Sequence, residues 1–411
     1  MTNAQSLLVQ LCTLPKIVYL DSSDFSDLSA AESNLSNDSR TVLAALRASV
    51  ANGTAKCLLS GIHLSEAVHA TDNPLHKQAA VRRASLMQEL CCHNFVRLPH
   101  EVMRLELEKA ISGRSDGRLS EEELFSAKSE WFGLSITPQL NRRRGLATAE
   151  LEKQIAHFPR NKRRKLKSEW RLSNESGRAR WRSLLQRNQA PQEFPFNLLS
   201  NQFVMDWLVG DRSDDDFHAR LIEILNDPKG LVECVLDLTD ERDTIYGLLR
   251  NQGVQIFSSI EASLQSVLEA AGGLIDLGHN EAVAKALRQA IQPTELRRTL
   301  VSQLAETSVE NFDDREISRL IATCPSVSVF LNMYVAYAHS VVESNLQRWR
   351  SGKRSVVARE PSDFGDMMHA VYAPYCDMFR CDAYFASLLK QDANIKHRVV
   401  DRRKLCSLYS P

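Results

Sequence analysis

The chain has 411 residues, of which 43% are hydrophobic and 25% charged, as in an ordinary soluble globular protein. Its 51 basic and 51 acidic residues give a formal net charge of zero, although they are unevenly distributed. Because domains beyond about 250 to 300 residues tend to split, the chain can bury one large core or two smaller ones. No run approaches the roughly 18 apolar residues of a membrane helix. Nine cysteines without a CxxC pair, and an N-terminus without a basic and then apolar stretch, lead us to expect a reduced, cytoplasmic protein without a signal peptide.

The first expected strand covers residues 16–20, KIVYL, a β-branched and aromatic run that is typical of a buried strand. It ends at Asp21, Ser22, Ser23 and Asp24, and a carboxylate and hydroxyls at the end of a strand suit a hard cation. The alternative is that Asp21 or Asp24 caps the next helix. Further along the chain we expect helices over residues 41–51, 61–70 and 101–111, the second carrying Glu66, and short strands over 57–60 and 94–98.

Residues 112–355 are expected to be helical nearly throughout. Leu and Ala recur at three- and four-residue spacing over residues 254–277, 281–291, 295–304 and 327–349. Within this part, residues 141–187 carry fifteen Lys and Arg against four Glu, a net charge of +11. Such a segment suits phosphate contacts and base stacking, although a solvated helical face is the alternative. The candidate nucleic-acid contacts are Arg163, Arg164, Lys165, Lys167, Trp170 and Trp181.

The C-terminal part concentrates four aspartates, Asp363, Asp366, Asp377 and Asp382, within residues 362–385. A helix that starts near Asp363 places Asp366 one turn on, on the same side. After Pro374, residues 376–381 are expected to form a short strand, with Asp382 just past its end. In open α/β sheets, ligands bind at the carboxyl ends of the strands, so this edge is the expected site.

This order of elements and acidic residues resembles that of the PIN-like nuclease family, whose acidic residues lie at the carboxyl edge of a parallel sheet. The resemblance covers residues 15–108 and 361–390 and is most specific in the tail HAVYAPYCDMFRCDAYF, which looks like the tail of bacterial PIN-like proteins. It implies an α/β fold, a PIN-like parallel sheet flanked by helices and split by a large, mainly α-helical insertion. Residues 15–111 and 356–411 would form the two halves of the nuclease domain. Residues 112–355 would be the insertion, with the basic segment at 141–187.

The resemblance also implies a site that binds Mg²⁺ or Mn²⁺ and hydrolyses phosphodiester bonds. Two departures from the family pattern are Ser22 and Ser23 in place of a common Thr-Asn pair, and Cys381 in place of the usual Thr. The matching positions are Asp21, Glu66, Asp366 and Asp382 as catalytic and metal-binding residues, with Asp24, Asp363 and Asp377 as further metal-ligand candidates and His369 as an auxiliary residue.

The implied function is a metal-dependent endoribonuclease, with RNA favoured because the family is mostly ribonucleolytic. Two alternatives stay open, namely a nucleic-acid-binding protein of the same fold with weak or no turnover, and a nuclease that acts on DNA. An RNase H-like site has a similar order of acids, but its first strand usually carries Asp-x-Glu, which is absent at Asp21. The biological role, as a toxin, in antiphage defence or in RNA processing, is left open. The oligomeric state is also open, and a homodimer is one possibility.

Overall fold

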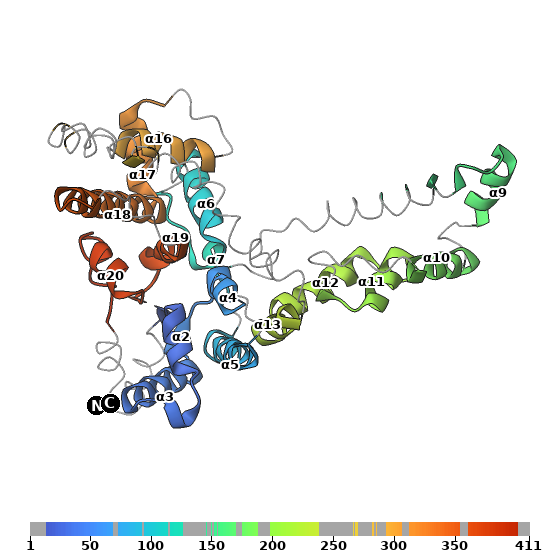
Figure 1. Cartoon of the computed structure of the whole chain (residues 1–411), viewed down its shortest axis with the longest axis horizontal. Helices are drawn as coiled ribbons and strands as arrows, with labels where there is room; N and C mark the ends of the chain where they lie inside the picture. The colour runs from blue at the N-terminus through green and yellow to red at the C-terminus, as the bar shows by residue number, and fades with distance from the viewer. Residues whose placement is uncertain are drawn as a thin grey trace, which may run out of the picture.

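The computed structural model places helices around a small parallel sheet, with a row of helices extending from this body as an arm (Figure 1). This confirms the expected α/β class. The structure describes residues 14–68, 73–92, 94–113, 116–125, 145, 149, 152–153, 155–169, 175–187, 198–237, 266, 268–269, 282, 285, 293–305, 312–353 and 361–401. The expected helical runs over residues 254–277 and 281–291 therefore lie almost entirely outside the described residues.

The sheet joins the two ends of the chain. The central strand β1 (Lys16–Tyr19) pairs in parallel with β2 (Ala55–Cys57) on one side and with β3 (Met378–Phe379) on the other. Val18 of β1 lies level with Met378 of β3, although 360 residues separate them. The expected adjacency of the first and last strands is thus confirmed.

The strand boundaries differ from those expected from the sequence. β2 begins two residues before the expected strand and shares only Cys57 with it, and residues 94–98 form only isolated bridges, from Phe95 to Leu59 and from Val96 to Phe125. β3 has two residues instead of six, because the 3₁₀ helix η4 (Ala370–Tyr375) precedes it and Asp382 already caps the next helix. Short pairing suffices here because the paired residues Val18, Tyr19, Met378 and Phe379 are all buried, two on each face of the sheet.

The helices start where the local sequence favours a start. Proline occupies the first turn of α5, α6 and α18, where its missing N–H is tolerated. Ser213 with Asp216, and Asp313 with Glu316, form capping boxes on α12 and α17. The helices of the body are α2 (Ser22–Leu28), η1 (Glu32–Asn34), α3 (Asn37–Ala51), α4 (Gly61–Ala67), α5 (Pro74–Cys91), α6 (Pro99–Ile111), α7 (Glu121–Leu124), α16 (Pro293–Leu304), α17 (Asp314–Thr323), α18 (Pro325–Arg350), α19 (Pro361–His369) and α20 (Ala383–Leu389).

The hydrophobic core is divided between the two faces of the sheet. Tyr19 and Phe379 belong to one buried cluster, while Val18, Leu20 and Met378 belong to the other, as the two-residue period of a strand requires. Helices α6, α16, α17, α18 and α20 cover the first face, and α2, α3, α5, α12 and α13 cover the second. The segment expected to be an insertion therefore supplies helices to both cores.

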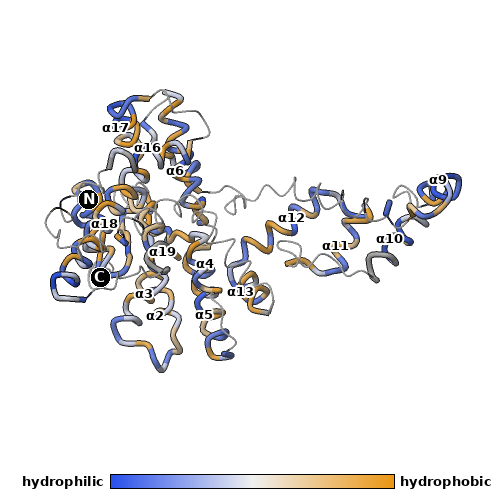
Figure 2. The backbone as a smooth tube through the Cα atoms, turned by 45° about the horizontal axis from the view of Figure 1, so that its top comes forward, coloured by the Kyte–Doolittle hydropathy of each residue, from blue (hydrophilic) through white to orange (hydrophobic). Residues whose placement is uncertain are grey.

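The arm consists of α9 (Arg160–Glu169), α10 (Glu175–Arg187), α11 (Asn201–Leu208), α12 (Asp214–Leu225) and α13 (Pro228–Asp237). Helix α13 packs on α5 of the body, and α12, α11 and α10 follow in a chain of pairwise contacts. In Figures 1 and 2, α9 lies at the far end of this row, beyond α10. Within the described residues, no single helix is long and apolar enough to cross a membrane. In this described part of the chain, one pair of helices, α17 and α18, has that length and composition when taken together, although the pair is bent by 111°.

Candidate functional site

Asp21 lies at the carboxyl end of the central strand and also caps a helix. Its Oδ2 accepts a hydrogen bond from Ser23 N at 3.1 Å, while Asp24 Oδ2 accepts one from Asp21 N at 3.1 Å, which completes a capping box on α2. The side chain of Asp21 is buried, and Ser23 Oγ also donates to it. The sequence left two interpretations of Asp21, a ligand for a cation and a helix cap. They are compatible, because the cap holds the carboxylate at the carboxyl edge of the sheet.

Glu66 of α4 and Asp366 of α19 come from distant parts of the chain and meet where these two helices pack together. A Cβ added at Gly365 would lie 3.3 Å from Glu66 Oε1, so α19 approaches the Glu66 carboxylate closely at the residue before Asp366. Asp382 is the N-cap of α20, where its Oδ1 accepts a hydrogen bond from Phe385 N at 2.6 Å. Each of the four acids is thus positioned by the start or the packing of a helix.

The pKa of Asp366 reports how near these charges are. Burial raises it to about 7, the charge of His369 opposes this, and the negative charges of Asp382, Glu66 and Asp21 each raise it further. Coulomb interaction falls with distance, so all three carboxylates lie within electrostatic range of Asp366. Asp366 is therefore the residue on which the charges of the other three acids act.

The donor chemistry of these residues fits Mg²⁺ or Mn²⁺, because both prefer carboxylate oxygens. Among the described residues, no three Asp, Glu, His or Cys side chains stand close enough together to hold a metal ion. The side chain of Asp363, a further ligand candidate, lies outside the described residues.

Two buried histidines, whose ring centroids lie 5.0 Å apart, extend the site into the core. His63 Nε2 donates to Leu20 O at 2.8 Å, so its Nδ1 is the acceptor for Ser60 N at 3.1 Å. These contacts need the neutral ring, and burial together with the His369 charge lowers the pKa of His63 to about 3. His63 was not singled out from the sequence, although it lies one helical turn before Glu66.

His369, the auxiliary residue expected from the sequence, is buried and faces Glu66. Its Nε2 lies 3.5 Å from Glu66 Oε1, and its Nδ1 is hydrogen-bonded to the hydroxyl of Tyr19. Burial lowers the pKa of His369, but the charge and hydrogen bonding of Glu66 together with the charges of Asp21 and Asp366 outweigh burial, and the pKa is raised. Burial likewise opposes ionisation of Glu66, yet the charge and hydrogen bonding of His369, with contributions from Ser22 and His63, lower the pKa of Glu66 to about 2. The two residues form an imidazolium–carboxylate pair in which His369 is buried and the Glu66 side chain is 32% exposed.

Two other expected ligands are placed elsewhere. Asp24 forms a bidentate ion pair with Arg380, with Oδ1–Nη2 and Oδ2–Nε distances of 2.6 and 3.0 Å. Asp377 accepts a hydrogen bond from Ile17 N at 2.8 Å, which puts it at the amino edge of the sheet, opposite to Asp21. Asp24 is therefore neutralised by a protein cation, and Asp377 lies too far along the strands to join the other acids.

The basic residues expected to contact nucleic acid lie on α9, at the end of the arm. Arg163, Arg164, Lys165 and Lys167 are all exposed. Lys165 lies 4.0 Å from Glu169, and Lys167 lies 2.5 Å from Glu152. Trp170 and the side chain of Trp181 lie outside the described residues.

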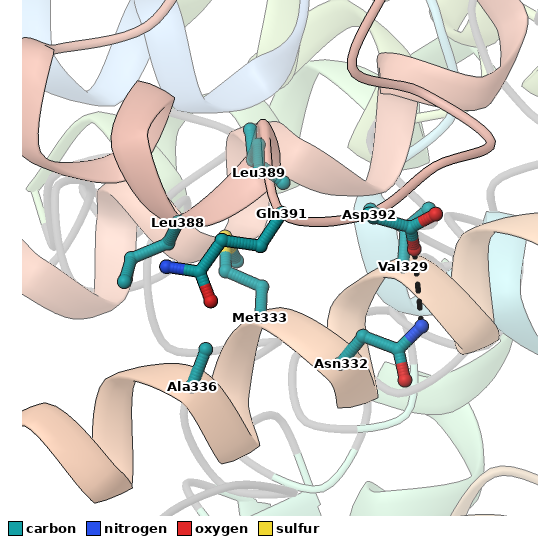
Figure 3. Close-up of a pocket in the computed structure, with 8 residues that line it drawn as sticks. All are labelled: Val329, Asn332, Met333, Ala336, Leu388, Leu389, Gln391 and Asp392. Atoms are coloured by element: carbon teal, nitrogen blue, oxygen red, sulfur yellow. Dashed lines mark hydrogen bonds between the residues drawn. The ribbon is translucent and has the colours of Figure 1, made fainter.

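A hollow between α18 and the end of α20 is distinct from this site (Figure 3). Asn332 Nδ2 donates to Asp392 Oδ2 across it at 3.0 Å. None of the four acids lines this hollow, whose walls are formed by Val329, Asn332, Met333, Ala336, Leu388, Leu389, Gln391 and Asp392.

Comparison with known proteins adds no relative. No family model matches the chain, and no curated protein and no solved structure matches it significantly. The function must therefore be argued from the residues themselves.

Proposed function

We propose that this protein is a PIN-like, metal-dependent nuclease that hydrolyses phosphodiester bonds, most readily those of RNA, at Asp21, Glu66, Asp366 and Asp382. The observation that carries the proposal is the raised pKa of Asp366, to which burial and the charges of the other three acids contribute. Carboxylates crowded in this way repel one another unless a cation compensates them. Residues 15–111 and 356–411 supply all four acids.

The protein's own contribution is to hold anionic oxygens in fixed places. The Ser23 N–H orients Asp21, the Phe385 N–H orients Asp382, and the His369 imidazolium keeps Glu66 ionised. The chemistry that Mg²⁺ or Mn²⁺ supplies when bound is Lewis-acid activation of water and neutralisation of charge at the scissile phosphate. Among the described residues these carboxylates do not stand close enough together to hold a metal ion, so metal binding would draw them closer.

Cleavage of matched oligonucleotides tests the proposal. Purified protein is incubated with RNA and DNA of the same sequence, with Mn²⁺, Mg²⁺ or EDTA, alongside the variants Asp366→Asn and Asp382→Asn. We expect metal-dependent cleavage of RNA that falls at least 100-fold in both variants, while Asp38→Asn, an exposed change on α3, cuts as wild type. Equal cleavage by all four proteins would place the activity elsewhere, and faster cutting of DNA would change the substrate.

A second function, nucleic-acid binding with weak or no turnover, is favoured by the His369–Glu66 pair. That pair already neutralises one of the four carboxylates inside the protein, so the need for a metal is smaller. RNA binding that persists in EDTA, together with no cleavage in either metal, would identify this function.

A further inference from the structure

The basic segment divides into two groups of side chains with different surroundings. On α10, Arg178 lies 3.1 Å from Asp211, Arg182 contacts both Asp206 and Asp211, and Arg180 lies 2.5 Å from Glu169. These arginines are engaged in holding neighbouring parts of the arm together. They are therefore poorly placed to contribute charge to a ligand.

Helix α9 is different because its charges point into solvent. It carries six basic side chains against one glutamate, and none of its residues is buried. Among the described residues, Arg163 and Arg164 have no ion-pair partner within 4.0 Å, and Lys165 is only at the limit of one. Exposed pairs of this kind contribute little, so most of the positive charge of α9 is available to a partner.

The position of α9 separates this charge from the carboxylates. The path from the body runs through α5, α13, α12, α11 and α10, and each packing step between helix axes is about 8 to 10 Å. The tip therefore lies on the order of 40 Å beyond α5, and Figures 1 and 2 both show it projecting from the body. At about 3.4 Å per nucleotide, a strand needs roughly twelve nucleotides to cover this distance.

We propose that α9 anchors the RNA backbone at a second site, separate from the carboxylates, and that the substrate is an RNA long enough to reach both. The length preference for cleavage rests on the proposed nuclease function, whereas the anchoring does not. Phosphates suit α9 because its cations are clustered, exposed and largely uncompensated. A membrane surface suits it less, since Leu166 is the single apolar side chain of the helix and an interfacial helix needs an apolar face.

The test compares two RNA lengths in two variants. The α9 variant combines Arg163→Gln, Arg164→Gln, Lys165→Gln and Lys167→Gln, because Gln keeps helix propensity while it removes charge. The control variant neutralises four exposed cations elsewhere, Arg220, Lys229, Lys353 and Lys396, in the same way. RNAs of about 8 and about 40 nucleotides that share one sequence bracket the estimated span. Binding is measured in EDTA over a range of salt concentrations, and cleavage is measured in Mn²⁺.

We expect wild-type protein to bind the long RNA at least tenfold more tightly than the short one. The α9 variant should lose this difference. Its slope of log affinity against log salt concentration should be shallower by about 0.7 for each lost phosphate contact. Cleavage of the short RNA should not change in either variant. Unchanged binding of the long RNA by the α9 variant overturns the anchor, as does an equal loss for both lengths. Preferential α9-dependent binding to anionic vesicles or to polyglutamate overturns the choice of partner.

In this experiment, the proposed anchor and the proposed nuclease function can be disproved independently. Length-dependent binding in EDTA without cleavage in Mn²⁺ would remove the proposed nuclease function and keep the anchor. Cleavage of both lengths at equal rates by wild type and the α9 variant would do the reverse.

Discussion

At the scale of single residues, the site is held at an electrostatic cost. The pKa of Asp366 is raised from its ordinary value of 3.8 to about 7 by burial and by three nearby carboxylates. Protonated Asp366 is therefore favoured in the folded state, and the free energy of unfolding of the metal-free protein falls as the pH rises from about 4 to about 7. A neutral side chain of the same shape avoids this loss.

Asp366→Asn should accordingly stabilise the metal-free protein at pH 7.5. A shift of one pKa unit corresponds to about 1.4 kcal/mol. Because Asp366 is partly exposed, we discount the full shift and expect a gain of about 1 to 2 kcal/mol. Denaturant unfolding in EDTA at pH 5.0 and 7.5 measures the difference, which should shrink at the lower pH. A variant less stable than wild type at pH 7.5 would show that Asp366 is a structural aspartate.

Metal binding should reverse the order of stability of wild type and Asp366→Asn. Mn²⁺ that binds the folded wild type raises its melting temperature, since a ligand specific to the native state stabilises it by mass action. Asp366→Asn removes a proposed ligand, so its melting temperature should respond less. Thermal melts with Mn²⁺ and with EDTA, run in parallel, provide the measurement. An equal increase in both proteins would mean that Asp366 does not contribute to metal binding.

Glu106 shows that a buried carboxylate can also be purely structural. It is fully buried and accepts hydrogen bonds from Ser326 N at 2.9 and 3.0 Å, from Val327 N at 3.3 Å and from the Tyr375 hydroxyl at 2.5 Å. Burial raises its pKa to about 7, and these hydrogen bonds oppose the rise. The carboxylate thus serves the N-terminus of α18, which has no side-chain cap of its own.

Replacing Glu106 by Gln should therefore destabilise the fold. The amide group turns a donor toward Ser326 or Val327, where only an acceptor fits, and a misplaced buried donor costs about 1 to 3 kcal/mol. Glu108→Gln is a matched control on the same helix. Its part-exposed ion pair with Arg104 is worth less than about 1 kcal/mol. Denaturant midpoints of the two variants measure the contrast, and equal midpoints would contradict the capping role.

At the scale of elements, the sequence predicts those parts whose cause is local. β1 follows from KIVYL, and the helix expected over residues 101–111 is α6, which begins two residues earlier at Pro99. β3 has only two residues, too short for a hydrophobic pattern to define its limits, and its identity depends on pairing with a strand 360 residues away. Residues 94–98 have the composition of a strand but find only isolated partners.

The same division applies to the site. Asp21 and Asp382 could be selected because each directly follows a strand pattern. The roles of His63, Glu106 and Asp24 could not, since each depends on a partner from another element. His63 bonds the Leu20 carbonyl, and Asp24 pairs with a residue 356 positions away. Side chains of the same type thus divide into site and scaffold only through tertiary contacts.

The Asp24–Arg380 pair connects α2 with the strand region of the C-terminal half. Both side chains are largely buried, at 4% and 13% exposure, so loss of one partner leaves an uncompensated charge in the core. Arg380→Met should therefore lower the free energy of unfolding by about 3 kcal/mol. Adding Asp24→Asn should recover much of this loss. A double-mutant cycle by denaturant unfolding measures the coupling, and additive effects would contradict it.

At the scale of the whole molecule, the segment between the two halves is part of their support. α18 contributes Phe330 and Tyr337 to the core on one face of the sheet, and α13 contributes Val232 and Val235 to the core on the other. A long segment between paired strands is tolerable because the entropy of loop closure grows slowly with length. In contrast, α9 at the tip of the arm contributes no buried residue to either core.

Two deletions should consequently behave in opposite ways. Replacing residues 126–197, which include α9 and α10, with a Gly/Ser linker of about 40 residues keeps α11–α13 and allows a span of roughly 35 Å. We expect this protein to unfold cooperatively, within a few degrees of wild type. Removing residues 112–355 strips α13 and α18 and exposes both faces of the sheet, so we expect an insoluble or unfolded product.

Circular dichroism melts and size-exclusion chromatography of both proteins check this expectation, and the first protein also tests how the arm is used. Because it retains Asp21, Glu66, Asp366 and Asp382, it should cut the short RNA as wild type does while losing the preference for the long one. A soluble, cooperatively folded product of the larger deletion would show that the halves do not need α13 and α18. An unfolded product of the smaller deletion would show that the arm tip supports the body as well as the substrate.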